Sequence, residues 1–344
     1  MTGPFRIKVL PGNYEFVVPA GKTILEAALA SSLRLPHSCD AGSCEICMGR
    51  LLQGEITIPR RGLHLTGDAE NPPSFLTCIA QPMSDSIIEI PNVLGPGELP
   101  QFTATCQIIE ATPLNHDVTR VVLRLPAGKR IQFLPGQYLE VMLNETDKVS
   151  FSIGNIDLNN RLIELHVRYV PTSESSNKFR DYLKTNKTIK VNLPKGQCII
   201  HHANDENPVL FLAGSTGFSP IKAMIEYLLA ANSDRTMYLY WGARIPADIY
   251  LPDLPREWEA KYPHFKYVPV ISDPIAENEW AGRRGFVHAA VLEDFPDLSS
   301  FDVYAGGSPG MVYAAFDAFT LQAKLDPERM YSDVFFYAPR KPAN

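Results

Sequence analysis

Four cysteines near the start of the sequence constrain the fold more than any other feature. Their spacing is C-x4-C-x2-C-x30-C, and the residues are Cys39, Cys44, Cys47 and Cys78. This spacing is typical of [2Fe–2S] ligation, in which a tight loop directs several thiolates into one pocket. We therefore predict that the N-terminal part of the chain folds around this loop and binds a two-iron cluster.

Two other interpretations of the cysteines remain open from the residues alone. Structural zinc normally pairs one C-x2-C knuckle with another, whereas Cys78 stands alone in a strand-like apolar run. A redox disulfide between Cys44 and Cys47 would leave the other two cysteines without a role. The chain has two further cysteines, Cys106 and Cys198, and both lie in apolar stretches that predict buried, unreactive thiols.

The residues around the cysteine loop have the pattern of a hairpin followed by a helix. Apolar and polar residues alternate over 5–9, a Pro-Gly-Asn turn follows, and residues 16–18 return the chain. Thr23 and Glu26 form a capping-box pattern before an alanine-rich stretch over 24–33, which predicts a helix. Gly42 lets the loop backbone approach a cluster closely. With its four cysteines, the stretch 1–94 resembles the β-grasp fold of plant-type ferredoxins.

Length and charge limit the classes of protein to be considered. At 344 residues, the chain is expected to form two or three domains. Its 32 basic and 38 acidic residues give a net charge of -6, which excludes a nucleic-acid binder that works by bulk positive charge. No apolar run approaches the ~20 residues that span a bilayer. We expect a soluble, cytoplasmic protein without a nucleic-acid or membrane partner.

Two further domains are expected after a Pro/Gly-rich linker at 95–102. The domain at 103–203 has short β-rich runs separated by turns, as in an antiparallel barrel, and these runs cover 105–108, 118–125, 137–143, 163–167 and 189–193. In the domain at 204–344, strands alternate with helices, as in a doubly wound parallel sheet. Ser219-Pro220 and Ser308-Pro309 are expected to begin two of those helices. The fold class is therefore multi-domain, α+β and α/β.

A glycine turn, Gly214-Ser215-Thr216-Gly217, follows the strand-like run at 209–212. Free amides at a helix start favour a phosphate there, although a plain structural turn explains these residues equally well. The order of motifs is more specific: Gly136-Gln137-Tyr138 and Phe151-Ser152-Ile153 precede the turn, and Gly306-Gly307-Ser308-Pro309 follows it. This order resembles the ferredoxin-NADP reductase superfamily. With the ferredoxin stretch, the whole chain resembles iron–sulfur flavoprotein reductases of multicomponent oxygenases, and it is most similar to CDP-6-deoxy-Δ3,4-glucoseen reductases.

The resemblance implies FAD and NADH as cofactors beside the [2Fe–2S] cluster. For FAD it implies contacts from two strands, their neighbours and a helix start, namely Gln137, Tyr138, Lys148, Phe151, Ser152, His166, Val167, Arg168 and Ser176. For the NAD diphosphate and its surroundings it implies Gly214, Thr216, Gly217 and Gly307. Ser152 would reach toward flavin N5, and Phe335 would cover the flavin face, so these two are the expected catalytic residues. Two simpler interpretations remain: Phe335 and Phe336 as a buried strand, and His166 as a satisfied core residue.

Four positions depart from the family pattern. Val149 stands where most members have an arginine on the FAD diphosphate, and the neighbouring Lys148 cannot reproduce a bidentate guanidinium. Ser173 and Leu193 replace glycines, and Gly306 replaces a cysteine that faces the nicotinamide. These changes predict a reduced affinity for FAD.

Electron counting connects the three cofactors. A nicotinamide delivers two electrons as a hydride, a [2Fe–2S] cluster accepts one, and a flavin can mediate between them. We expect an NADH-dependent reductase that passes electrons to a protein acceptor, an oxygenase component. The alternative is a glucoseen reductase that supplies an iron–sulfur sugar-nucleotide dehydrase. A third possibility, from another class, is a ferredoxin-like binding or sensing module fused to a degenerate flavin domain.

Overall fold

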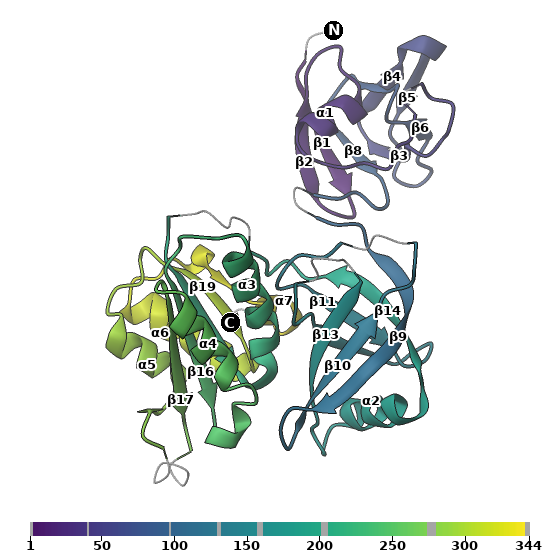
Figure 1. Cartoon of the computed structure of the whole chain (residues 1–344). Helices are drawn as coiled ribbons and strands as arrows, with labels where there is room; N and C mark the ends of the chain where they lie inside the picture. Colours follow the sequence, from purple (N-terminus) through teal and green to yellow (C-terminus); the bar gives the residue numbers. More distant parts are fainter. Residues whose placement is uncertain are drawn as a thin grey trace. The chain divides into compact units, whose positions relative to one another are not determined.

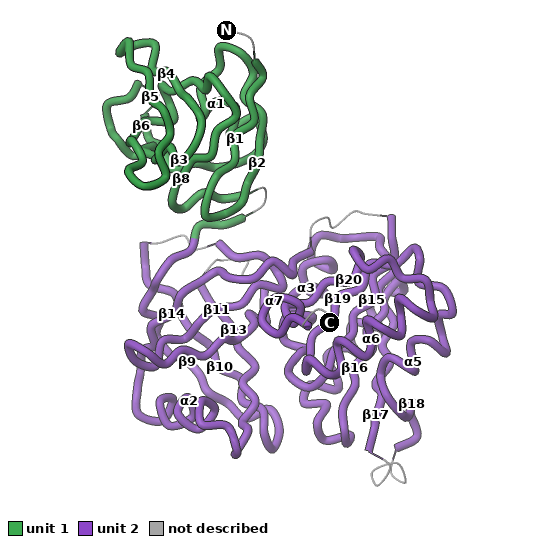
Figure 2. Tube along the Cα trace, turned by 180° about the vertical axis from the view of Figure 1, so that it is seen from behind, with its two compact units in different colours: residues 1–100 green, residues 101–344 purple. Residues whose placement is uncertain are grey.

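The computed structural model describes residues 3–39, 41–95, 98–128, 132–156, 161–200, 206–273 and 280–340. The chain divides into two compact units, Met1–Pro100 and Gln101–Asn344 (Figure 2). This division falls within the predicted linker. Within the described ranges, no helix has both the length and the apolar character needed to cross a membrane.

The first unit is built on a five-stranded sheet in the order β2-β1-β8-β3-β6. These strands are β2 (Tyr14–Val18), β1 (Phe5–Leu10), β8 (Ser86–Glu89), β3 (Met48–Gln53) and β6 (Ser74–Leu76). β1 pairs antiparallel with β2, which confirms the predicted hairpin, and parallel with β8. A smaller sheet has the order β5-β4-β7, with β5 (Leu63–Thr66), β4 (Glu55–Ile58) and β7 (Gln81–Pro82).

Helix α1 (Ile24–Ala30) packs on the first sheet through an apolar face that includes Ile24 and Ala28. The predicted capping box is present: the Glu26 amide donates to Thr23 Oγ1 at 3.2 Å, and the Thr23 amide donates to Glu26 Oε2 at 2.9 Å. The helix is shorter than predicted because Ser32 has a φ of 60°, which lies outside the helical region.

A six-stranded antiparallel sheet begins the second unit, in the order β12-β11-β14-β9-β10-β13 (Figure 1). The strands are β12 (Lys148–Ser152), β11 (Tyr138–Met142), β14 (Thr188–Lys195), β9 (Phe102–Pro113), β10 (Val118–Arg124) and β13 (Leu162–Arg168). The Gly154 amide donates to the Glu164 carbonyl at 2.8 Å and so joins the two edges into a nearly closed barrel. Helix α2 (Glu174–Thr185) inserts Phe179 into the barrel core. The barrel is confirmed, although β12 was not predicted.

The rest of the second unit is a parallel sheet in the order β18-β17-β16-β15-β19-β20. Its strands are β18 (Arg283–Arg284), β17 (Phe265–Ile271), β16 (Met237–Ala243), β15 (Val209–Gly214), β19 (Asp302–Gly306) and β20 (Met330–Tyr331). Alternate residues of β15 enter two cores: Val209 and Phe211 face the core of α3 (Phe218–Ala230) and α4 (Asp253–Lys261). Leu210 and Leu212 face the core of α5 (Val287–Asp294) and α6 (Pro309–Gln322). Two covered faces confirm the doubly wound fold.

Two local expectations need correction. Helix α3 begins at Phe218, one residue before Ser219, because a 3-10 turn over Ser215–Gly217 runs directly into it. By contrast, Ser308 caps α6 as expected, accepting from the Met311 amide at 3.4 Å. The segment with Phe335 and Phe336 is not a buried strand but the short helix α7 (Val334–Tyr337), on which Phe336 is exposed.

Candidate functional site

The four cysteines of the first unit form two pairs. The Sγ atoms of Cys39 and Cys44 lie 3.1 Å apart, and those of Cys47 and Cys78 lie 3.3 Å apart. Among the described residues, no three His, Cys, Asp or Glu side chains meet as ligands of a single ion. Two thiolate pairs fit a cluster with two cysteine ligands on each iron better than zinc, which gathers four protein ligands around one ion.

The loop that carries these cysteines is shaped by Gly42. Its φ is +74°, and a Cβ at this position would lie 2.8 Å from Ile79 Cδ1. Arg61 Nη2 donates to the Gly42 carbonyl at 3.2 Å, which attaches the loop to the second sheet. Hydrogen bonds from Ser43, Cys44 and the loop backbone lower the pKa of Cys39 to about 5. The loop therefore favours the thiolate that a metal requires.

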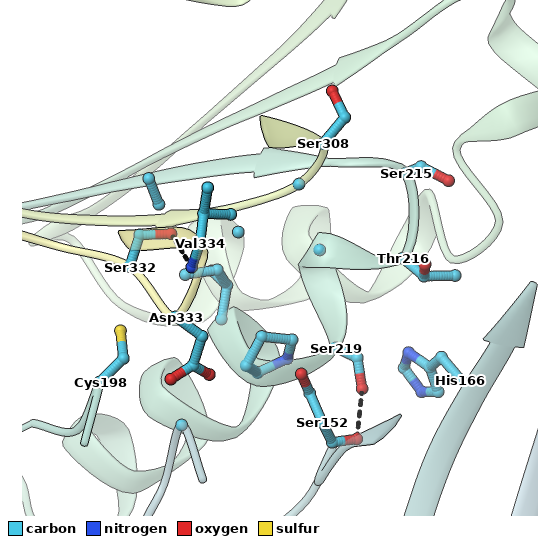
Figure 3. A pocket seen from close by; sticks show the side chains of 18 of the residues that line it. Ser152, His166, Cys198, Ser215, Thr216, Ser219, Ser308, Ser332, Asp333 and Val334 are labelled. Atoms are coloured by element: carbon cyan, nitrogen blue, oxygen red, sulfur yellow. Dashed lines mark hydrogen bonds between the residues drawn. The ribbon is translucent and has the colours of Figure 1, made fainter. Parts of the chain in front are cut away.

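Two adjoining cavities lie in the second unit. The first, ≈ 360 Å³, is lined by barrel residues and by the turns that follow β15 and β19, where the strand order of the parallel sheet reverses (Figure 3). Ligands of doubly wound folds bind at this switch point. The second, ≈ 550 Å³, continues along the parallel sheet. Both cavities are lined by Arg168, Gly214, Ser215 and Ser308.

Residues predicted from separate motifs meet in the first cavity. They come from β12 and β13 of the barrel and from the two turns of the parallel sheet, and they are Phe151, Ser152, His166, Arg168, Gly214, Thr216, Gly217 and Gly307. Ser219 Oγ donates to the Ser152 carbonyl at 3.4 Å across the seam between barrel and sheet (Figure 3). The cavity thus brings the flavin motif and the nucleotide turn to one place.

Five other predicted barrel contacts do not line the first cavity. Gln137 is buried, with Oε1 accepting from the Leu134 amide at 2.7 Å. The Tyr138 ring packs on Gly196, and Val167 faces the barrel core. The remaining two are Lys148, which is exposed on β12, and Ser176, whose Oγ accepts from the Val170 amide at 2.9 Å.

Phe335 also lies away from the first cavity. Its ring packs against Tyr313 and Phe316 of α6, with both centroid distances 5.5 Å. Tyr337, three-fifths exposed at the end of α7, is the C-terminal aromatic residue that lines the cavity. Because α7 is helical, residues 335 and 337 point in different directions, which the sequence pattern did not reveal.

A close backbone contact explains the unusual Gly306. A Cβ on Gly306 would lie 2.3 Å from the Gly217 carbonyl oxygen, and a Cβ on Gly217 would lie 2.2 Å from the carbonyl of Gly306. The turns after β15 and β19 therefore touch through two glycines. A side chain at either position would force these turns apart.

Asp333 is a cavity residue that the sequence analysis missed. It lies beside Cys198 (Figure 3). Burial raises the pKa of its carboxyl to about 7, while a hydrogen bond from the Cys198 backbone amide acts in the opposite direction. No motif marks this residue, because its environment is created by two segments that are distant in sequence.

The raised pKa of Asp333 predicts a pH-dependent stability. An aspartate in an unfolded chain titrates near ~3.9, so the folded state holds this proton more tightly. The associated stability is complete below the unfolded pKa and is lost as the pH rises through about 7. Asp333→Asn is expected to stabilise the flavin-free protein by about 1–3 kcal/mol more at pH 8 than at pH 5. Denaturant unfolding of both proteins at pH 5 and pH 8 measures the difference in the free energy of unfolding. An equal difference at the two pH values would contradict the prediction.

The walls of the second cavity predict a preference for NADH over NADPH. Arg244 Nη2 lies 3.6 Å from Asp273 Oδ2, so a neighbouring carboxylate offsets its charge. Asp248 adds another negative charge to the wall, which disfavours a 2′-phosphate. We expect kcat/KM to favour NADH by roughly tenfold or more, and Asp248→Asn to narrow this ratio. Steady-state kinetics with both coenzymes provide the test, and a wild-type preference for NADPH would refute the prediction.

The absence of an arginine at position 149 predicts weak FAD retention. Val149 is half-buried on β12, beside the exposed Lys148. A hydrogen bond to a charged group contributes ~1.5–3 kcal/mol, so Val149→Arg is expected to raise FAD affinity by one to two orders of magnitude. Fluorescence titration of apoprotein with FAD measures the change, with Lys148→Ala as the test of the neighbouring cation. Nanomolar binding by the wild type, unaffected by Lys148→Ala, would show that other groups hold the diphosphate.

Comparison with known proteins assigns a domain type to each region. Residues 7–83 match the 2Fe-2S iron-sulfur cluster binding domain, residues 105–200 the oxidoreductase FAD-binding domain, and residues 211–317 the oxidoreductase NAD-binding domain. Both cysteine pairs lie within the first match. The first cavity is lined by residues from the FAD-binding match and from the NAD-binding match. The chain therefore has domains for a [2Fe–2S] cluster, FAD and NAD.

Several proteins are similar to this chain over nearly its whole length. Protein RfbI of Salmonella typhimurium is 37% identical, with 96% of each chain covered. The CDP-6-deoxy-L-threo-D-glycero-4-hexulose-3-dehydrase reductase of Yersinia pestis is 35% identical, covering 96% of this chain and 98% of the relative. The reductase component 1 of terephthalate 1,2-dioxygenase from Comamonas is 32% identical, covering 97% and 98%. The crystal structure of the Amycolatopsis cytochrome P450 reductase GcoB matches with a TM-score of 0.65 at 28% identity, covering 95% and 97%. The chain therefore belongs to the family of iron–sulfur flavoprotein reductases, which carry electrons from NADH through FAD to a [2Fe–2S] centre.

Proposed function

We propose that this reductase delivers its electrons to an iron–sulfur dehydrase that acts on a nucleotide-linked sugar. The observation that carries the proposal is the 35% identity to a CDP-6-deoxy-hexulose dehydrase reductase over 98% of that protein. The match includes the ferredoxin unit, from which electrons leave the chain. The motifs of the sequence had favoured an oxygenase component as the acceptor, with the dehydrase as the alternative, and the proposal reverses that order.

In this proposal the site residues divide by cofactor. Cys39, Cys44, Cys47 and Cys78 hold the cluster, and residues 103–203 and 204–344 form the FAD and NAD domains. Ser152 and the neighbouring strand residues hold the flavin, and the glycine turn after β15 holds the NADH diphosphate at a helix start. Arg168 lines both cavities, so its guanidinium is placed to contact a diphosphate between them.

An oxygenase component is the second candidate acceptor. The terephthalate dioxygenase reductase component is 32% identical over 98% of its length, only slightly below the dehydrase reductase. The internal path from NADH to the cluster is common to both candidates, so the acceptor alone distinguishes them.

Acceptor-dependent NADH oxidation tests the proposal. The purified holoenzyme is mixed with NADH and either a CDP-6-deoxy-hexulose dehydrase with its substrate or a terephthalate dioxygenase component with its substrate. Ferricyanide reduction serves as a control for the internal electron path. Coupled turnover with the dehydrase supports the proposal, whereas turnover with the oxygenase component alone favours the second candidate.

A further inference from the structure

A buried charged cluster joins the barrel to the parallel sheet. Lys222 of α3 is 7% exposed, and its Nζ lies 3.2 Å from Glu164 Oε1 of β13 and 2.8 Å from Glu226 Oε1. The opposite oxygen of Glu164 accepts from Arg120 Nε at 2.7 Å. Burial raises the pKa of the Glu164 carboxyl, but His166 and Lys222 outweigh it and hold that pKa well below its usual range. Glu164 is therefore held in its ionised form, whereas burial raises the pKa of Glu226.

His166 completes this cluster from the cavity side. Its Nε2 lies 2.9 Å from Glu164 Oε1, and its Nδ1 lies 2.8 Å from the hydroxyl of Tyr250. Burial lowers the pKa of His166, so we assign a neutral ring that donates from Nε2 to Glu164 and accepts at Nδ1. His166 is thus both a satisfied buried residue and a wall of the first cavity.

Two bonds from helix α3 reach residues 152–154 at the end of β12, a segment that we call the flavin strand. Lys222 Nζ donates to the Gly154 carbonyl at 2.9 Å, and Ser219 Oγ donates to the Ser152 carbonyl at 3.4 Å. Ser219 and Lys222 are three residues apart and so share one face of α3. A Cβ on Gly154 would lie 2.7 Å from Ser219 Oγ, so the absence of a side chain permits this approach. Helix α3 follows directly after the nucleotide turn, Ser215–Gly217.

We propose that Lys222 is a positioning residue for hydride transfer, which fixes the nucleotide turn against the flavin strand. Interfaces between domains of one chain normally permit relative motion. Here an ammonium inside the interface bonds the strand backbone directly and is fixed by two carboxylates. Because a displacement of ~1 Å can reduce a reaction rate about 10²-fold, holding these two segments together favours the transfer step more than coenzyme binding. The proposal concerns the NADH-to-FAD step and does not depend on the identity of the acceptor.

The first test replaces Lys222 by methionine, which keeps much of the side-chain volume and removes the charge. Stopped-flow reduction of the bound flavin at saturating NADH is expected to slow by about tenfold or more. The dissociation constant for NADH is expected to change by less than about threefold, because the second cavity lies outside the lysine's contacts. The charge-transfer absorbance between NADH and flavin should weaken. Hydrogen exchange without nucleotide should accelerate at the amides of residues 152–154.

Lys178→Met is the matched control. Lys178 of α2 also pairs with two carboxylates, Asp147 at 2.8 Å and Glu174 at 2.9 Å, but it is exposed and both partners belong to the barrel domain. This variant should retain the wild-type transfer rate, charge-transfer band and exchange pattern.

A double variant, Lys222→Met with Glu164→Gln, separates positioning from stability. Methionine alone leaves the Glu164 carboxylate buried without its ammonium partner, so the single variant is expected to unfold at a lower temperature. The double variant should recover part of that loss while its flavin reduction stays slow and its exchange at 152–154 stays fast. Recovery of the rate together with stability would overturn the proposal, as would a wild-type rate and charge-transfer band in the single variant.

Discussion

Replacing Cys44 by serine is expected to abolish cytochrome c reduction while leaving flavin reduction by NADH intact. Cys44 forms one of the two sulfur pairs with Cys39, and loss of one thiolate removes one of the two cysteine ligands of one iron. We expect about two iron and two sulfide per wild-type chain and a marked loss of both in the variant. Metal and sulfide analysis of anaerobically purified protein, with stopped-flow flavin reduction, measures both effects.

The control for this experiment is Cys106→Ala. Cys106 is buried in the barrel core of the second unit, whereas the cysteine pairs belong to the first, and burial raises the pKa of Cys106 to about 11. This variant should keep its iron and its cytochrome c reduction. Zinc in place of iron in the wild-type protein would disprove the assignment of the cluster.

Gly217→Val is expected to lower the rate of flavin reduction by NADH about 10²-fold or more. A Cβ at this position would lie 2.2 Å from the backbone of Gly306, so the two turns that line the cavity must separate. The iron–sulfur content and the FAD content should be unchanged, because neither depends on the contact between the two glycines. Stopped-flow flavin reduction over a range of NADH concentrations gives the limiting rate and the affinity.

Ala230→Val enlarges an exposed side chain at the end of α3, the helix that follows Gly217, and serves as the control. It should reduce flavin at the wild-type rate. Wild-type kinetics in Gly217→Val would show that the contact between the two glycines does not shape the site.

The elements that the sequence predicted best are those with strong local signals. The cysteine spacing, the capping box at Thr23 and the Ser308 cap each depend on a few neighbouring residues, and the structure contains the paired sulfurs and both caps. By contrast, β12 was missed although its residues, Lys-Val-Ser-Phe-Ser, alternate polar and apolar, because two apolar residues in a run of five are a weak signal. Its pairing with β11 comes from tertiary context.

The sequence predicted the separate motifs of the site but not how they come together in one cavity. The flavin motif around Ser152 and the glycine turn could be read separately, whereas their convergence depends on how the barrel packs on the parallel sheet. The environments of Asp333 and Lys222 arise only from that packing. Phe335 shows another limit, since the sequence pattern did not determine which way a ring on a four-residue helix points.

The hairpin between β9 and β10 reaches the edge of the second cavity. Asn115 Nδ2 donates to the Ala247 carbonyl at 2.8 Å, and His116 Nε2 lies 3.5 Å from Asp248 Oδ1. The surroundings of Asp248 are therefore divided between two domains. A chimaera that exchanged only residues 204–344 with a relative would transplant Asp248 without the barrel residues that surround it. We therefore expect domain exchange to transfer the coenzyme preference of this chain only when the hairpin is exchanged together with the parallel sheet.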